Sequence, residues 1–285
     1  MNDLRTIVSV ADESEEIFIN TDNDDSERSG PTSTRSESTT VFGFLAIATF
    51  VPLVFFGLLV AEPHSEQQES VKLMFIHLPS VLVTYVSFFC TLVCSILYLT
   101  KKSKFWDLLA GASAEIGVLF CGILLLSGSL WGKPTWGVYW QWDPRLTSTA
   151  VMFVMYLGYL AVRRMDIAAE AKSRRAAVLG IVSFLNVLIV HYSIDWWRGL
   201  HQGRTFESSE IKIEGWYLFS LMFGMLFFSF VAIWMVIHKF RILWLEYQLE
   251  RMDLELAINE RRSEVNDLDS SIDADEEELL FGGGS

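Results

Sequence analysis

The 285-residue chain combines 51% hydrophobic side chains and a mean hydropathy of +0.33 with a formal net charge of −13. The negative charge lies at the two ends. Residues 1–41 carry ten acidic and three basic side chains, residues 246–285 carry thirteen and three, and residues 42–245 are therefore left with +4. This separation excludes a water-soluble globular protein and predicts a membrane domain between two acidic tails.

Six apolar stretches are long enough to cross a bilayer as helices, since a span needs about 20 residues. They lie at roughly 42–60, 76–99, 106–130, 147–163, 176–195 and 216–238. The connections between them are too short for a second domain. We therefore expect an all-α fold, a polytopic bundle of six transmembrane helices over residues 42–240.

The basic residues predict the orientation of this bundle, because Lys and Arg concentrate in the short cytoplasmic loops. Alternate connections and the end of the sixth span hold most of them: Lys101, Lys102, Lys104, Arg163, Arg164, Lys172, Arg174, Arg175, Lys239 and Arg241. Both termini are then expected in the cytoplasm, and residues 131–148 on the outer side.

The tails carry no recognisable chemistry. Residues 1–41 lack the basic region of a secretory signal, and their Ser, Thr, Asp and Glu content predicts disorder. Residues 241–268 are expected to form a cytoplasmic amphipathic helical arm, either a solvated stalk or a partner-binding element, because Leu245, Leu249, Met252 and Leu256 recur at helical spacing. Residues 269–285 are expected to be an acidic disordered tail, and the final Gly282–Ser285 has the composition of an expression scar.

The three cysteines, Cys90, Cys94 and Cys121, all fall inside predicted spans, and no CxxC motif is present. They are expected to be apolar packing residues. A thiol-disulfide reductase is therefore not expected.

The sequence WGKPTWGVYWQWDPRLTS at residues 131–148 concentrates tryptophan between two spans. Seven of the ten tryptophans are expected on the outer side, which is more than an interfacial anchoring belt requires. Exposed indole and phenol rings suit a flat, rigid, apolar partner such as a porphyrin. Asp143 and Arg145 add groups that orient such a partner. Gly132, Pro134, Gly137 and Pro144 predict an irregular connection rather than a spanning helix.

A porphyrin iron needs axial ligands, and the chain holds five histidines. His64 lies in a polar loop and His238 at the inner end of the sixth span. His77 opens the second span in IHLPS, with Pro79 expected in the first helical turn, and His201 follows the fifth span in DWWRGLHQG. From the pattern alone, His77 and His201 are either axial ligands or interfacial histidines, with His191 as a substitute.

The stretch SGSLWGKPTWGVYWQWDPRLTS resembles the tryptophan-rich WWD signature of membrane proteins in cytochrome c maturation, and six spans with the RLTS ending resemble CcmC, the haem exporter protein C family. IHLPS and DWWRGLHQG match the family in order and topology over approximately residues 42–240. Longer acidic tails, Tyr139 in place of a common Trp, and Pro144 after the signature Asp are departures from it.

The resemblance implies a function. Such proteins hold haem b at the outer, periplasmic face of the inner membrane and pass it to the haem chaperone CcmE, together with the ABC transporter subunits CcmA and CcmB and the small protein CcmD. It implies His77 and His201 as axial ligands. It also implies that a WWD segment, residues 131–148, contacts the porphyrin through six positions: Trp131, Trp136, Trp140, Trp142, Asp143 and Arg145.

This reading predicts haem handling and transfer rather than an enzyme, with the lipid bilayer as surroundings and no nucleic-acid partner. Arg145, with Arg198 or Arg204, is expected to bind the propionates, and Asp143 to shape the loop. Glu115, inside the third span, is expected either to pair with a base on a neighbouring helix or to line a route for haem. The alternatives are a haem-containing electron-transfer subunit and a haem-free membrane scaffold or permease.

Overall fold

The computed structural model describes residues 31–61, 69–197 and 215–281. The chain divides into two units, residues 1–32 and 33–285, and every helix that the structure describes belongs to the second. The described residues form helices and turns without a strand, so the predicted all-α class is confirmed.

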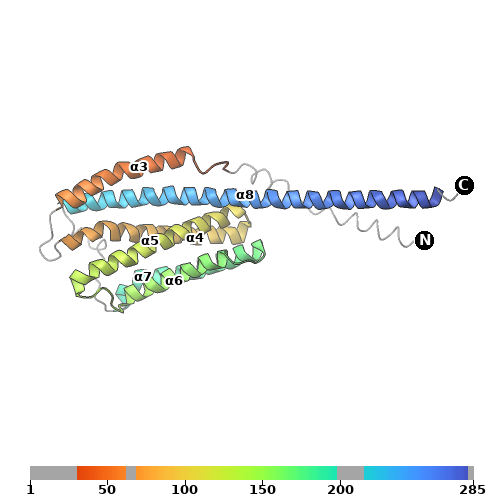
Figure 1. Ribbon diagram of the computed structural model, residues 1–285. Helices are drawn as coiled ribbons and strands as arrows, with labels where there is room; N and C mark the ends of the chain where they lie inside the picture. Colours follow the sequence, from red (N-terminus) through yellow and green to blue (C-terminus); the bar gives the residue numbers. More distant parts are fainter. Residues whose placement is uncertain (1–30, 62–68, 198–214, 282–285) are drawn as a thin grey trace. The chain divides into compact units, whose positions relative to one another are not determined.

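Six helical segments are long and apolar enough to cross a membrane, which confirms the predicted number of spans in the described part of the chain. Figure 1 shows them in order. They are α3 (Glu37–Val54) continued by the π-helical turn η1 (Phe55–Val60), a 3-10 turn η2 (Glu69–Leu73) leading into α4 (Met74–Lys101), α5 (Lys104–Trp136), α6 (Pro144–Arg163), α7 (Ala169–Trp196) and α8 (Gly215–Phe281).

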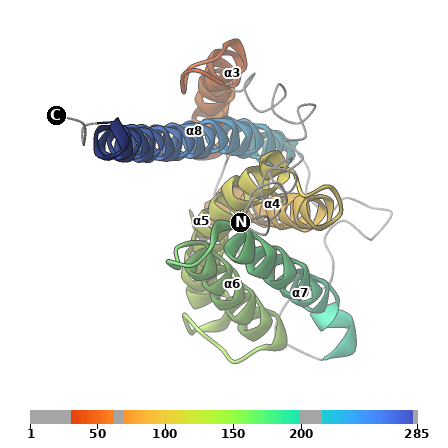
Figure 2. The same cartoon turned by 90° about the vertical axis from the view of Figure 1, so that its right-hand side faces the viewer.

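The helices run alternately up and down through the bundle. α4 and α5 pack side by side in the middle, α3 lies along α8 on one side, and α6 and α7 lie together on the other (Figures 1 and 2). The largest core cluster contains buried side chains from all four of the helices α4, α5, α6 and α7. At its centre the rings of Phe88 and Tyr156 stack with centroids 3.5 Å apart, next to Cys121 and Met152, all four fully buried.

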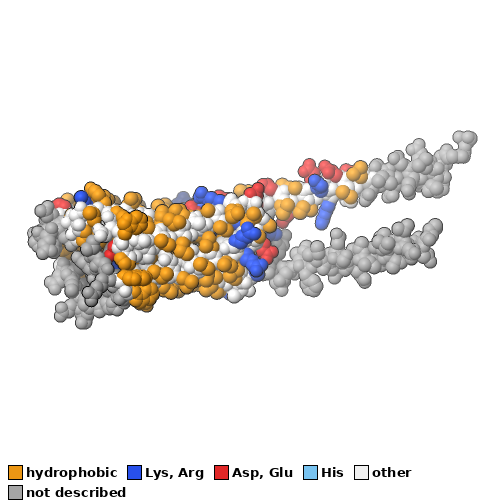
Figure 3. Space-filling model, turned by 90° about the horizontal axis from the view of Figure 1, so that it is seen from below, with side chains coloured by type: hydrophobic (Ala, Val, Ile, Leu, Met, Phe, Trp, Pro, Cys, Tyr) orange, Lys and Arg blue, Asp and Glu red, His pale blue; other side chains and the backbone are white. Residues whose placement is uncertain are grey.

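The alternation separates two chemically different ends. The ends of α5 and α7 and the starts of α4, α6 and α8 form what we call the tryptophan end, which carries seven indoles: Trp131, Trp136, Trp140, Trp142, Trp196, Trp197 and Trp216. The opposite, basic end carries the Lys and Arg residues that predicted the orientation. Figure 3 shows blue side chains gathered where α8 leaves the bundle.

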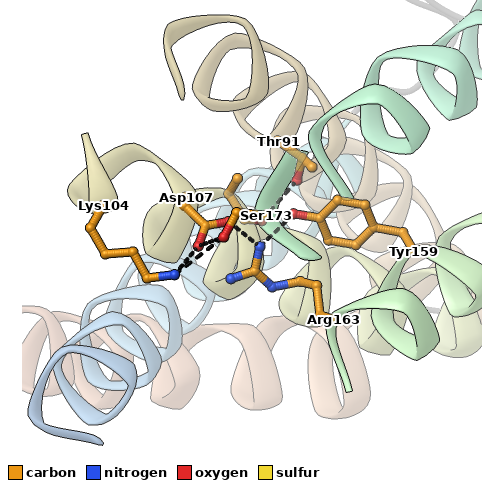
Figure 4. Close-up of polar contacts among 7 residues, drawn as sticks. Thr91, Lys104, Asp107, Tyr159, Arg163 and Ser173 are labelled. Carbon is orange, nitrogen blue, oxygen red and sulfur yellow. Dashed lines mark hydrogen bonds and ion pairs between the residues drawn. The ribbon is translucent and has the colours of Figure 1, made fainter. Parts of the chain in front are cut away.

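A buried polar network ties the basic end together (Figure 4). Asp107, 3% exposed at the start of α5, pairs with Arg163 of α6 at 2.6 Å and with Lys104 at 2.7 Å. Ser173 of α7 donates to the same carboxylate at 2.8 Å. Three helices are therefore held by one carboxylate. Nearby, Glu115 pairs with Lys239 of α8 at 2.9 Å, so it has the basic partner on a neighbouring helix that the sequence suggested.

The prediction that residues 131–136 form a loop was wrong. α5 continues through Gly132 and Pro134 as far as Trp136. A proline so close to the helix end removes a single backbone N–H from the ladder, which does not stop the helix. The stop is Gly137, whose φ of +81° is the left-handed conformation that glycine adopts without strain. Only residues 137–143 connect α5 to α6.

Pro79 is not a first-turn residue either, because α4 begins at Met74. Proline at 79 cannot donate to the carbonyl of Phe75, four residues earlier. α8 approaches that carbonyl closely, since a Cβ added at Gly224 would lie only 2.9 Å from the Phe75 oxygen. Glycine at 224 therefore allows close packing of α8 on α4 at this level.

The ends of the bundle differ from the predicted boundaries. α3 starts at Glu37, inside the predicted tail, because Ser36 and Thr39 form a reciprocal capping box. The arm runs beyond residue 268 to Phe281 as part of α8, where disorder was expected. Arg241 donates to the carbonyls of Ser33 and Arg35 at 2.7 and 3.1 Å. The remaining predicted tail, residues 1–30, lies outside the described residues.

Candidate functional site at the tryptophan end

His77 lies in the first turn of α4 and is half-buried. Its imidazole meets Trp131 of α5 edge to face, with ring centroids 5.7 Å apart and an interplanar angle of 69°. Its Nδ1 is 3.2 Å from the hydroxyl of Ser127, also on α5. The structure therefore brings the predicted ligand His77 to the first tryptophan of the WWD segment.

The first two tryptophans of the segment are packed against the protein. Trp131 covers the apolar cluster of Met74, Phe75 and Leu221, which joins α4 to α8. Trp136 lies over Gly132, where an added Cβ would meet its ring at 3.1 Å. A larger residue at 132 would push this indole by a few tenths of an ångström, so glycine there lets Trp136 pack closely on α5.

The connection after Gly137 presents further rings outward. Trp140 and Trp142 meet edge to face, with centroids 5.7 Å apart, and Trp142 is 80% exposed. Tyr139 is exposed as well, beneath the ammonium group of Lys133 at 5.2 Å from the ring centroid. An apolar surface this open at a bundle end is typical of a site that contacts a flat ligand or a partner.

Asp143 shapes the start of α6, as the sequence suggested. It is the N-cap residue, it is buried, and its Oδ1 accepts the backbone N–H of Arg145 at 2.9 Å. Pro144 then occupies the first helical turn, where its missing N–H removes nothing from the ladder. This accounts for proline after the signature Asp. Asn186 of α7 donates to the Ser148 carbonyl at 2.9 Å, in the next turn of α6, and so links the start of α6 to α7.

Arg145, the last of the six predicted WWD positions, lies in the first turn of α6, and its Nε is buried. Its predicted partners, Arg198 and Arg204, lie outside the described residues, as does the second predicted ligand, His201.

His191 is exposed on α7, with its ring 6.3 Å from that of Tyr85. The two line an apolar groove of about 310 Å³ between α4 and α7, with Phe89, Phe184 and Leu188. His238 lies at the basic end, against Trp234 at 4.8 Å. Among the described residues no three His, Cys, Asp or Glu side chains gather to hold a bare metal ion. A porphyrin iron needs fewer side-chain ligands than a bare metal ion, because the protein supplies only its axial ligands.

Sequence reasoning missed the two residues beneath His77, Ser127 and Gly128. A Cβ added at Gly128 would lie 2.9 Å from Cε1 of the imidazole. The available signal was helical spacing, since Ser127 lies four residues before Trp131 and so shares its face of α5. This shared face could be inferred only once α5 was known to continue past residue 131.

The profile of the family described as "CcmC: Heme exporter protein C" matches residues 29–255. A Heme exporter protein C from Bradyrhizobium diazoefficiens is 40% identical over 165 residues, 57% of this chain and 62% of the relative. The protein of the same name from Escherichia coli K12 is 34% identical over 165 residues, 57% of this chain and 67% of the relative.

A third relative, a putative cytochrome c biosynthesis ccmC-like mitochondrial protein from Marchantia polymorpha, is 32% identical over 149 residues, 52% of this chain and 63% of the relative. The aligned region thus covers less than two thirds of the Bradyrhizobium and Marchantia proteins. The family profile nevertheless covers most of the chain and includes all six helices in whole or in large part. This multi-pass membrane protein belongs to the heme exporter protein C family.

Proposed function

We propose that this protein handles haem for cytochrome c maturation, holding haem b at the outer face of the inner membrane and passing it to the chaperone CcmE. The observation that carries the proposal is the contact between His77 and Trp131, at the end of the bundle where Trp140 and Trp142 are also presented. The names of the relatives, which refer to haem export and cytochrome c biosynthesis, support the same function.

His77 and His201 are the proposed axial ligands. Neutral imidazole is a common iron ligand, and His77 lies near the start of α4 with its ring against Trp131. Bound haem would supply the iron and the reactive edge of the ring. The protein would supply its position and its electronic surroundings.

The WWD segment divides into two roles in this proposal. Trp131 and Trp136 are packed on the bundle and form a fixed wall for the porphyrin. Trp140 and Trp142 stand further out, and the 80% exposure of Trp142 leaves its ring available to the ligand or to the chaperone. Arg145 is the proposed propionate partner. Handling a ligand in this way needs no acid, base or nucleophile.

The basic end is proposed to face the cytoplasm, because Lys and Arg concentrate there and favour that side. The tryptophan end then faces outward, where a chaperone can reach the haem. The subunits CcmA, CcmB and CcmD are proposed partners in the membrane, and the polar part of α8 is an accessible cytoplasmic surface for them.

The test is the visible spectrum of the detergent-purified protein, its His77→Ala and His201→Ala variants, and a His238→Ala control at the opposite end. We expect a six-coordinate low-spin haem in the parent and the control. Each ligand variant should lose the haem or become high-spin, and should not load added chaperone. A colourless parent, or ligand variants with the parent spectrum, would contradict the proposal. Haem that stays bound while the chaperone remains empty would favour electron transfer instead.

A further inference from the structure

We propose that Ser127 is a positioning residue for His77. In this proposal Ser127 holds the imidazole in the tautomer that carries its hydrogen on Nδ1, so that Nε2 is the nitrogen that would bind the iron. Gly128 provides the space in which the ring can take this orientation. The inference rests on the proposed function, because it concerns how His77 presents itself to haem.

The hydrogen bonds of Ser127 carry the tautomer argument. Its Oγ lies 2.7 Å from the Ile123 carbonyl, 3.2 Å from the Leu124 carbonyl and 3.2 Å from Nδ1 of His77. A hydroxyl has one hydrogen to donate, and a carbonyl oxygen can only accept. The shortest contact takes that hydrogen, so it goes to Ile123. The oxygen of Ser127 then accepts from His77, which requires N–H at Nδ1.

Burial strengthens this assignment. Ser127 is 5% exposed, and an unsatisfied polar group in such a place is costly. The arrangement in which Ser127 donates to Ile123 and accepts from Nδ1–H satisfies both of its hydrogen-bonding functions. In the opposite tautomer, the Ile123 carbonyl and Nδ1 would both need the single hydroxyl hydrogen, so Ser127 could not keep its bond to Ile123 and also bind His77.

Gly128 fixes which edge of the ring faces α5. A Cβ built there would lie 2.9 Å from Cε1, 3.4 Å from Nδ1 and 4.0 Å from Nε2 of His77. The Nδ1–Cε1 edge of the ring therefore lies against α5 at Gly128, and Nε2 is the ring nitrogen further from this glycine. Trp131, one turn further along α5, meets the same ring. Three residues on one helix thus set both the tautomer and the orientation.

A hydrogen bond from Nδ1–H makes an imidazole a stronger iron ligand, and such supporting partners typically change metal affinity by about 10- to 100-fold. It also stabilises the ferric state, since a more electron-donating ligand favours the higher charge on iron. The Ser127 contact is therefore expected to strengthen the bond to iron and to lower the reduction potential of the bound haem.

The first experiment measures the tautomer without haem. Long-range proton–nitrogen NMR of the haem-free, [15N]histidine-labelled protein at about pH 8, where imidazole is neutral, distinguishes the two forms. The His77 signal is assigned by its absence in His77→Ala. We expect hydrogen on Nδ1 in the parent and a shift toward the Nε2 form in Ser127→Ala. A parent with hydrogen on Nε2 would overturn the inference, whatever the protein does with haem.

The second experiment measures the effect on bound haem. Ser127→Ala is compared with Ser220→Ala, a matched control that loses the same kind of bond to a carbonyl one turn earlier, from Ser220 Oγ to Trp216 at 2.7 Å. We expect Ser127→Ala to raise the reduction potential and to lower by about 10-fold or more the imidazole concentration that displaces the protein ligand. Ser220→Ala should match the parent.

Gly128→Ala provides a separate route if Ser127→Ala does not fold, with Gly122→Ala on the same helix as its control, since a Cβ at 122 meets only ordinary contact at 3.7 Å. Gly128→Ala should weaken the bond to iron more than Gly122→Ala. Equal behaviour of each variant and its control, in a parent that binds haem through His77, would overturn the inference alone. A parent spectrum unchanged by His77→Ala would instead overturn the proposed function.

Discussion

Replacing Asp107 by asparagine tests the buried network at the basic end. Asp107→Asn keeps the shape of the side chain and removes its charge. The carboxylate is 3% exposed and faces Arg163 at 2.6 Å and Lys104 at 2.7 Å, with Ser173 donating at 2.8 Å. The Arg163 side chain is only 17% exposed, so the variant leaves a guanidinium in a poorly solvated place without its counter-charge.

The expected loss of stability follows from the close approach of these charges. Two unit charges about 4 Å apart attract by about 4 kcal/mol at an effective dielectric constant of about 20. Removing one partner of a buried pair costs about 3–5 kcal/mol in measured cases. The amide oxygen of asparagine still accepts a hydrogen bond, worth about 1 kcal/mol. We therefore expect Asp107→Asn to lower the free energy of unfolding by about 3 kcal/mol.

The assay is unfolding in mixed micelles with increasing SDS, followed by circular dichroism. Glu170→Gln is the control, because Glu170 and Lys102 are 3.8 Å apart and more than half exposed, and such pairs contribute about 0–1 kcal/mol. Asp107→Leu combined with Arg163→Met should recover part of the stability lost in Asp107→Leu alone, because the Arg163 guanidinium no longer lacks a counter-charge and only Lys104, the more exposed of the two bases, has lost its partner. Equal losses in Asp107→Asn and Glu170→Gln would refute the reasoning.

The remaining predictions concern packing and capping, and the same unfolding assay measures them. Gly117→Ala should lower the free energy of unfolding by about 1–3 kcal/mol, because the new Cβ would lie 2.5 Å from the Phe88 ring. Gly158→Ala should raise it by about 0.5–1 kcal/mol, because a Cβ there has no neighbour within 4 Å and alanine is the better helix former. A stabilising Gly117→Ala would contradict the core packing. Asp143→Ala should lower the free energy of unfolding by about 1 kcal/mol, because α6 loses its N-cap hydrogen bond. Asp143→Asn should keep most of that stability, since asparagine is also a good N-cap residue. Equal losses of stability in the two variants would exclude the capping role.

Much of this fold could be predicted from the sequence. Length and apolar content gave six spans, and all six are present in the described part of the chain. Because consecutive spans alternate in direction, successive connections lie at opposite ends of the bundle, and the same pattern therefore predicted that the tryptophans and the basic residues gather at opposite ends. The grouping of His77 with Trp131 followed from that topology. The second ligand, His201, stays a prediction.

Local signals were less reliable where prolines fall inside helices. Pro79 and Pro134 suggested a helix start and a loop, yet α4 and α5 pass through both. A proline removes one backbone donor, and the packing of a long apolar helix outweighs that loss. The sequence therefore placed the spans correctly and misjudged where α5 ends.

The sequence by itself determined the membrane bundle, its two ends and the residue types of the candidate site, because hydropathy, charge and motif order are properties of the chain alone. Only the tertiary structure decided that Ser127 and Gly128 lie beneath His77 and that Asp107 joins three helices. Serine, glycine and aspartate have no distinctive pattern in an apolar segment. Their roles come from the side chains that other helices bring within 3–4 Å of them, at distances set by helix packing.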